Sequence, residues 1–167
     1  MQLNFTGSVD ILHFALPFVP KQATSRLVFI SSVAGCIGVP FRTYYCASKW
    51  ALHGFAGALR QELTHAYGPA APKVVVQCPP EVKSELNTGG RLEFGAGTPA
   101  ESLPSTQVPT DVAVQLLIRG IAAGERYTHF SRMSSVLHAL YTCLGGVIDG
   151  LVMKTVLKNH KTNGQGR

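Results

Sequence analysis

Two short apolar runs, separated by one long helical pattern, limit the fold of this chain more than any other feature. The runs are Arg26-Leu-Val-Phe-Ile-Ser31 and Lys73-Val-Val-Val-Gln-Cys78, and the helical pattern extends without an internal proline from about Thr43 to Tyr67. The second run is continuously apolar rather than alternating, which is typical of a strand covered on both faces. Parallel strands joined by a helical crossover fit this order best.

The remaining segments extend the pattern to an α/β domain. Hydrophobic spacing predicts a mostly buried helix over residues 3–19, a second helix over 110–123 and a last one over 133–157. A third strand is predicted over residues 125–130. The segment 81–108 is rich in Gly, Pro, Ser and Thr, and its length predicts a functional or mobile loop.

Composition and spacing exclude several classes of protein. A chain of 167 residues, 46% hydrophobic and 14% charged, suits one globular domain. The net charge of +6 is scattered along most of the chain, so no nucleic-acid-binding stripe is predicted. The histidines and cysteines show no paired ligand spacing, and we therefore predict no metal site. Reduced, mostly buried thiols are expected at Cys36, Cys46, Cys78 and Cys143.

A tyrosine and a lysine stand four residues apart at the start of the long helix, in Thr43-Tyr-Tyr-Cys-Ala-Ser-Lys-Trp50. Side chains at i and i+4 share one helix face, with Cβ atoms roughly 5–6 Å apart, so Tyr45 and Lys49 point at the same place. The bare pair is more typical of an exposed face on which a tyrosine ring packs against a lysine stem. Its context favours a site, because the preceding strand delivers Ser32 into a loop and the first helix carries Asn4.

The stretch Ile30-Ser-Ser-Val-Ala-Gly35, followed by Tyr45-Cys-Ala-Ser-Lys49 and preceded by Asn4, resembles the catalytic segment of the short-chain dehydrogenase/reductase family. The resemblance implies a Rossmann-like, doubly wound parallel sheet with flanking helices. Only its catalytic half is expected here, without the N-terminal cofactor-binding half. The implied activity is that of an NAD(P)-dependent oxidoreductase acting on an alcohol or ketone, of the steroid type or another small lipophilic carbonyl.

The resemblance also implies a role for each residue. Tyr45 is the general acid or base, and Ser32 hydrogen-bonds the substrate oxygen. Lys49 assists the tyrosine and holds the nicotinamide ribose, while Asn4 supports a water that relays protons. Reduction of a carbonyl builds negative charge on oxygen, so a proton must arrive with the hydride. A nearby positive charge makes a phenol a better proton donor.

The segment that would contact the cofactor differs from the family pattern. Where the family usually has Pro-Gly-x-Val-x-Thr, this chain reads PPEVKS from Pro79 to Ser84, and Pro80 replaces a glycine that allows close backbone approach. The family's glycine-rich phosphate-binding turn is not in the sequence, so we expect NADP or NAD to bind this chain weakly or not at all. The implied cofactor contacts are Tyr45, Lys49, Pro79, Val82 and Ser84.

Residues 1–130 are predicted to form the catalytic domain, and residues 131–167 an amphipathic helix with a basic tail. A helix that covers the substrate pocket is favoured over one lying on a membrane, although Lys154, Lys158 and Lys161 would suit an anionic surface. The combination resembles the hydroxysteroid-dehydrogenase-like branch of the family. This branch implies an intracellular protein, associated with the endoplasmic reticulum membrane or cytoplasmic.

A non-catalytic function stays open, in which the chain is a truncated isoform that binds partners. Without a preceding half, the Leu27 to Ser31 strand is expected to leave an open apolar edge that pairs with other chains. Subunits of the family commonly pair through the two helices that here contain Asn4 and Tyr45. We therefore expect a homo-oligomer, or pairing with a full-length subunit.

Overall fold

A parallel three-stranded sheet organises the protein, in the order β1-β2-β3. The computed structural model describes residues 1–40, 42–83, 107–131, 134–141, 143–145, 147, 151 and 154. The strands are β1 (Arg26–Ile30), β2 (Lys73–Cys78) and β3 (Tyr127–His129). Both pairings are parallel, which confirms the α/β prediction, and the third strand is shorter than expected.

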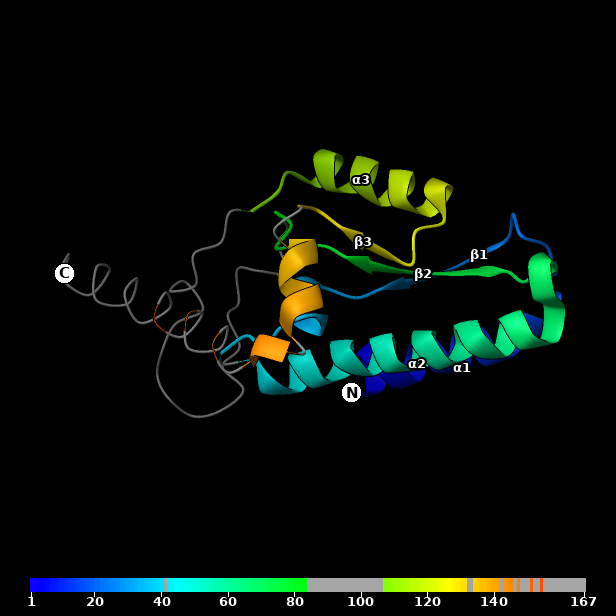
Figure 1. Cartoon of the computed structure of the whole chain (residues 1–167), viewed down its shortest axis with the longest axis horizontal. Helices are drawn as coiled ribbons and strands as arrows, with labels where there is room; N and C mark the ends of the chain where they lie inside the picture. The colour runs from blue at the N-terminus through cyan, green and yellow to red at the C-terminus, as the bar shows by residue number, and fades with distance from the viewer. Residues whose placement is uncertain are drawn as a thin grey trace.

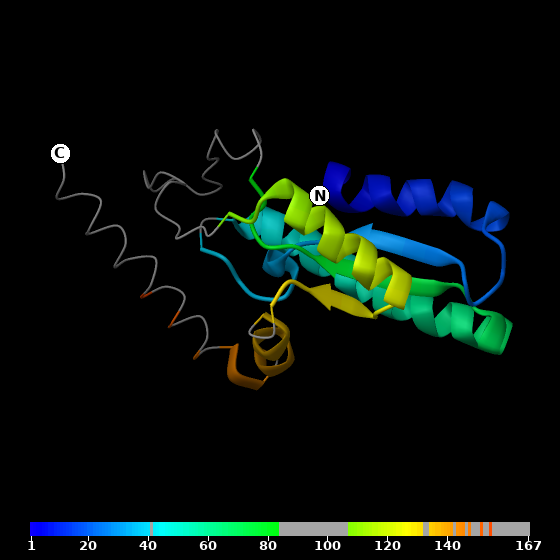
Figure 2. The same cartoon turned by 90° about the horizontal axis from the view of Figure 1, so that it is seen from above.

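Helices cover both faces of this sheet. α1 (Gly7–Ala15) and α2 (Thr43–Tyr67) lie on one face and α3 (Thr110–Ala123) lies on the other (Figure 1 and Figure 2). α2 ends at Gly68, which has φ 54°, and α3 ends at Gly124, which has φ 67°. Glycine adopts this left-handed backbone without the strain that a side chain would add. The described residues also form short helical turns, which are η1 (Gln2–Thr6), η2 (Leu16–Phe18), η3 (Val33–Gly35) and η4 (Gly68–Ala70).

The core lies between the sheet and α2. β2 is the central strand, and Val75, Val76 and Cys78 are completely buried, as its continuous hydrophobicity predicted. Side chains of α2 at spacings of three and four residues meet the sheet. Each buried aliphatic side chain of this kind contributes about 1.5–3 kcal/mol. The α2 residues of the core are Leu52, Ala56, Leu59 and Leu63.

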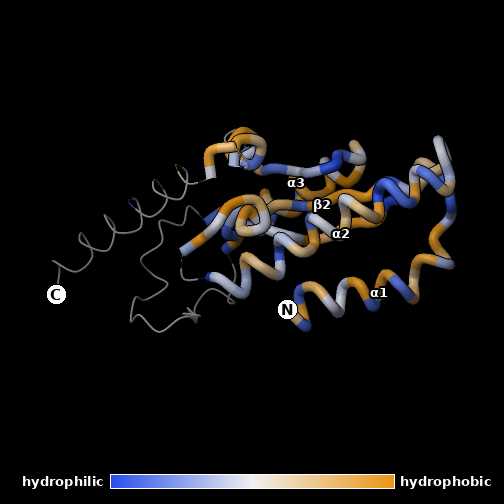
Figure 3. Tube along the Cα trace, turned by 60° about the horizontal axis from the view of Figure 1, so that its bottom comes forward, coloured by the Kyte–Doolittle hydropathy of each residue, from blue (hydrophilic) through white to orange (hydrophobic). Residues whose placement is uncertain are grey.

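The first helical region is less buried than the sequence predicted. Residues Phe5, Leu12 and Leu16 pack against the core, but Phe14 and Phe18 are exposed. Hydrophobic residues occur along α1, as the orange parts of its tube in Figure 3 show. A helix on the outside of the domain buries only one stripe of its side chains. The prediction of a mostly buried helix over residues 3–19 is therefore wrong.

Other segments differ in detail. The loop after β1 holds the short helix η3, and residues 134–141 and 143–145 are helical, within the predicted last helix. The two ends of the 81–108 segment meet in a parallel bridge between Val82 and Val108, while residues 84–106 lie outside the described part. β1 pairs only with β2 among the described residues. None of the described helices has the length and apolar character needed to cross a membrane.

The contact between α3 and β3 requires a glycine. A Cβ atom on Gly120 would lie 2.0 Å from Oγ1 and 2.5 Å from Cγ2 of the buried Thr128. We expect Gly120→Ala to lower the free energy of unfolding by about 1–3 kcal/mol, because the helix must move off the strand. Gly57→Ala is the control, since a Cβ there meets nothing within 4 Å, and it should raise stability by about 0.5–1 kcal/mol. Urea denaturation of both variants measures the difference, and equal stability would contradict the packing.

Candidate active site

The first turns of α2 place Tyr45 and Lys49 together. The Lys49 ammonium lies 5.6 Å from the centroid of the Tyr45 ring, as the four-residue spacing predicted. Its Nζ donates a hydrogen bond of 2.9 Å to the carbonyl of Ile30, the last residue of β1. Burial lowers the pKa of Lys49 below its ordinary value, because removing water penalises the charged form. A positive charge in a partly dry setting acts strongly on a neighbouring phenol oxygen.

Ser32 lies directly after β1, in extended backbone. Its hydroxyl accepts a 3.2 Å hydrogen bond from the Ala34 amide and donates a 3.4 Å one to the Pro79 carbonyl. The Val33 amide donates to the same carbonyl at 3.0 Å. The structure thus brings together Ser32, predicted to bind the substrate, and Pro79, predicted to contact the cofactor.

Asn4 lies on η1 and reaches the Tyr45–Lys49 helix through a serine. Its Nδ2 donates a 3.1 Å hydrogen bond to Oγ of Ser48, which in turn donates at 2.7 Å to the Tyr45 carbonyl. Ser48 is completely buried. The sequence prediction missed this serine, although its place within the Tyr-Cys-Ala-Ser-Lys motif was visible.

The remaining cofactor candidates lie after β2. Val82 is partly buried and is held in the bridge to Val108 by hydrogen bonds of 3.0 Å and 2.9 Å on either side of it. Ser84 lies outside the described residues. The sequence prediction that Pro79, Val82 and Ser84 contact a cofactor stays a prediction.

Gly35 fixes the distance between the Ser32 loop and α2. A Cβ atom there would lie 2.5 Å from Oγ of Ser31, 2.8 Å from Nε2 of His53 and 3.0 Å from the Lys49 carbonyl oxygen. Ser31 and His53 are both buried, so neither can move aside easily.

We expect Gly35→Ala to lower the free energy of unfolding by about 1–3 kcal/mol, because η3 must move away from α2. The matched control is Gly54→Ala, on the exposed side of α2, where a Cβ meets nothing within 4 Å. Urea denaturation compares the two variants. A Gly35→Ala protein as stable as the control would show that this approach is not required.

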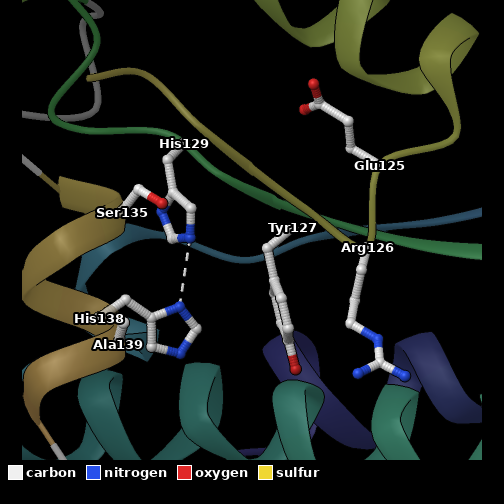
Figure 4. A pocket seen from close by; sticks show the side chains of 7 residues that line it. All are labelled: Glu125, Arg126, Tyr127, His129, Ser135, His138 and Ala139. Carbon is white, nitrogen blue, oxygen red and sulfur yellow. Dashed lines mark hydrogen bonds between the residues drawn. The ribbon is translucent and has the colours of Figure 1, made fainter. Parts of the chain in front are cut away.

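Three histidines, His53, His129 and His138, lie close together near the loop that carries Ser32. His138 Nδ1 lies 3.2 Å from His129 Nε2, and the rings of His53 and His138 are 5.4 Å apart. A cavity of about 570 Å³ opens onto two of the rings, where His138 of the 134–141 helix faces His129 of β3 (Figure 4). Burial, then the two neighbouring imidazoles, lower the pKa of His53 to about 4. Sequence spacing gave no signal for this group because its members come from distant elements.

The comparisons with known proteins agree with this geometry. The sequence model of the short chain dehydrogenase family matches residues 1–92. Human dehydrogenase/reductase SDR family member 7 is 35% identical over 88 residues, which cover 52% of this chain and 24% of that protein. Hydroxysteroid 11-beta-dehydrogenase 1-like protein B of Xenopus laevis is 45% identical over 60 residues, which cover 36% of this chain and 20% of that protein.

A solved structure has the same fold. The short chain dehydrogenase from Burkholderia cenocepacia J2315, in complex with NADP, aligns with a TM-score of 0.68 at 14% identity, over 90% of this chain and 56% of that one. The structural match shows an α/β fold of the same kind. The chain belongs to the short-chain dehydrogenase family. It spans about a quarter or less of the length of the two curated relatives named above.

Proposed function

We propose that this chain carries the proton-transfer site of an NAD(P)-dependent oxidoreductase that interconverts a lipophilic alcohol and ketone. The observation that carries the proposal is the Lys49 ammonium 5.6 Å from the Tyr45 ring, at the end of the strand that leads into Ser32. Ligands of open parallel sheets bind outside the carboxyl ends of the strands, which is where this group lies.

The residues present suit the nicotinamide end of a dinucleotide. An ammonium has three N–H donors, so the bond from Lys49 to Ile30 leaves capacity for ribose hydroxyl oxygens. Pro79 and the Ser32 loop lie side by side next to it. When bound, the reduced cofactor supplies a hydride to the carbonyl carbon. We propose either NADP or NAD for this role.

The chain's own residues handle the proton and the oxygen. Tyr45 donates its hydroxyl proton to the oxygen that becomes an alcohol, and the charge of Lys49 stabilises the phenolate left behind. Ser32 turns its hydroxyl from the Pro79 carbonyl, a long and therefore weak bond of 3.4 Å, toward the substrate oxygen. Asn4 holds the helix in place through Ser48.

An apolar surface beside the site supports a lipophilic substrate. Tyr141 accepts a 3.1 Å hydrogen bond from the Gly38 amide, and its ring lies 5.6 Å from that of Trp50. The helix of residues 134–141 therefore packs beside the loop that follows Ser32. The name of the Xenopus relative, a hydroxysteroid dehydrogenase-like protein, agrees with such a substrate. Leu144 and Leu151 are exposed as well, and apolar side chains of this kind would suit a place at the endoplasmic reticulum membrane.

A substrate panel tests the proposal. We expect a full-length form of the protein, which includes a phosphate-binding turn, to consume NADPH or NADH with a steroid ketone or a long-chain ketone, and much less with acetone, which lacks apolar surface to bury. Oxidation of the matching alcohols is measured in the same assay with NADP and NAD. A folded protein that turns over none of these compounds in either direction would contradict the proposal.

A second candidate function, binding a further subunit, has its own observation. Ile11, Phe14 and Phe18 recur every three or four residues and are 72%, 74% and 85% exposed. Contiguous exposed apolar side chains of this kind mark interaction surfaces. The partner we propose is a second copy of this chain or a complete subunit of the same family.

Light scattering combined with calorimetric titration of each cofactor tests this function. We expect a dimer or larger oligomer with weak cofactor binding, and Phe14→Glu should reduce the mass to that of the monomer. Phe14 is 74% exposed, so this change leaves the core intact. A monodisperse wild-type monomer with micromolar cofactor affinity would contradict the subunit-binding function and favour the oxidoreductase function.

A further inference from the structure

Five metal-ligating side chains meet at the carboxyl ends of the strands, each from a different segment. Cys36 follows η3, His53 lies on α2, and Cys78 ends β2. His129 ends β3, and His138 belongs to the helix of residues 134–141. Cys78 and His129 are register partners in the parallel sheet, so their side chains leave the same face.

Their donor atoms form two triads that share Cys36, and each triad is compact enough to hold an ion. The donors of Cys36, His53 and Cys78 all lie within 4.8 Å of one another, and so do those of Cys36, His129 and His138. Ligand atoms of a tetrahedral zinc ion lie roughly 3.3–3.8 Å apart, given bonds of about 2.0–2.1 Å to nitrogen and about 2.3 Å to sulfur. The Nδ1–Nε2 distance between His138 and His129 is 3.2 Å, and that from Cys78 Sγ to His53 Nε2 is 3.8 Å.

The protein alone does not satisfy the polar atoms of this cluster. Nδ1 of His53 and Nδ1 of His129 are buried without a hydrogen-bond partner among the described residues. His53 is only 8% exposed, and Cys36 and Cys78 are 1% and 0% exposed. An unpaired buried polar group costs about 1–3 kcal/mol, and such groups point to an ion or ordered water.

The cluster also has an entrance. His129 and His138 are partly exposed and line the cavity of about 570 Å³ in Figure 4, whereas the thiols of Cys36 and Cys78 are buried and are not among its lining residues. An ion from solvent would therefore meet the imidazoles first and the cysteines next. Thiolates and imidazoles together favour zinc over magnesium or calcium, which take oxygen ligands.

We propose that this cluster binds one Zn²⁺ ion through Cys36, His129 and His138, whose donor atoms lie within 4.8 Å of one another. Cys36 also belongs to the second triad, so Cys78 and His53 lie beside the ion as further donors. The proposed metal site departs from the sequence prediction of none, because its ligands show no short paired spacing along the chain.

Zinc at this position would stabilise the loop that carries Ser32. The Cys36 thiol contacts the Ser32 carbonyl oxygen at 3.8 Å. The Ser32 hydroxyl donates a hydrogen bond to the carbonyl of Pro79, in the loop after β2. One ion held by Cys36, His129 and His138 would join the Ser32 loop to β3 and to the helix of residues 134–141. The role is structural and is independent of turnover.

Metal titration of the full chain tests the proposal. After stripping with a chelator under reducing conditions, we expect one equivalent of Zn²⁺ to bind and to raise the Tm by roughly 5–10 °C at one hundred times its Kd. Co²⁺ should replace it and give a thiolate-to-cobalt charge-transfer band with the intense visible absorption of a tetrahedral site. Absence of both binding and the charge-transfer band would overturn the proposal.

Matched variants locate the ion. Cys36→Ser should weaken Zn²⁺ binding by more than the roughly 10–100-fold that changes outside the ligand shell cause, and remove cobalt–thiolate absorption. Cys46→Ser is the control, because Cys46 is buried elsewhere and contacts the Val39 carbonyl. If Cys36→Ser does not fold, His138→Gln on the partly exposed helix is used, with His13→Gln as its control. Equal Zn²⁺ affinity in ligand and control variants would place the ion elsewhere and overturn the proposal.

Discussion

Replacing Tyr45 by phenylalanine should leave the fold intact and lower kcat by roughly 10²-fold or more, the usual contribution of a positioned proton donor. The substitution removes one hydroxyl from a partly buried ring and keeps the ring itself beside Lys49. The measurement is steady-state turnover, at saturating cofactor, in a form of the protein that reduces a carbonyl substrate. Circular dichroism and Tm establish that the fold is unchanged.

The neighbouring residue supplies the control for this prediction. Tyr44 lies one position earlier on α2 and is 57% exposed. Side chains at adjacent helix positions face different directions, so Tyr44→Phe should leave kcat within about twofold of the wild type. Undiminished turnover in Tyr45→Phe would remove the central assignment.

The second large effect is expected for Lys49→Met, which keeps the length of the stem and removes the charge. We expect a fall in kcat and a rise in the KM for the cofactor, each of about 10–100-fold, because the ammonium serves both the tyrosine and the ribose. A hydrogen bond to a charged group contributes about 1.5–3 kcal/mol, which corresponds to this range. The bond to the Ile30 carbonyl is also lost, so Tm should be measured alongside.

Lys49→Arg separates charge from geometry. A guanidinium keeps the positive charge but presents a planar fork, so we expect partial recovery of kcat and little recovery of cofactor binding. The pH dependence of kcat should change in Lys49→Met and much less in Lys49→Arg. A pH–rate profile that Lys49→Met leaves unaltered would show that the lysine does not act on the tyrosine.

Local pattern predicted most of the fold. The bounds of α2 at Tyr67 and of β2 at Cys78 were correct, because Gly68 and the proline pair after β2 end these elements in any context. The same holds for α3, whose last residue Ala123 precedes a left-handed glycine. The Tyr45–Lys49 contact was predictable too, since helix geometry alone brings i and i+4 together.

What could not be predicted depends on packing between distant segments. Periodicity identifies the apolar residues of α1 but not which of them meet the core, so the exposure of Phe14 was missed. The bond from Asn4 to Ser48 spans two elements and leaves no spacing signal. The cysteine and histidine cluster beside Ser32 was missed for the same reason, because its five members come from five separate segments.

A double-mutant cycle in Tyr45 and Lys49 tests the central claim most directly. The account holds that the two side chains act as one proton-transfer unit, and residues that act as a unit have strongly non-additive effects on kcat. We predict that Tyr45→Phe combined with Lys49→Met lowers kcat no more than Tyr45→Phe alone, within about threefold, because no phenol remains for the lysine to assist. Losses in kcat that multiply across the two substitutions would contradict the account and assign the residues independent roles.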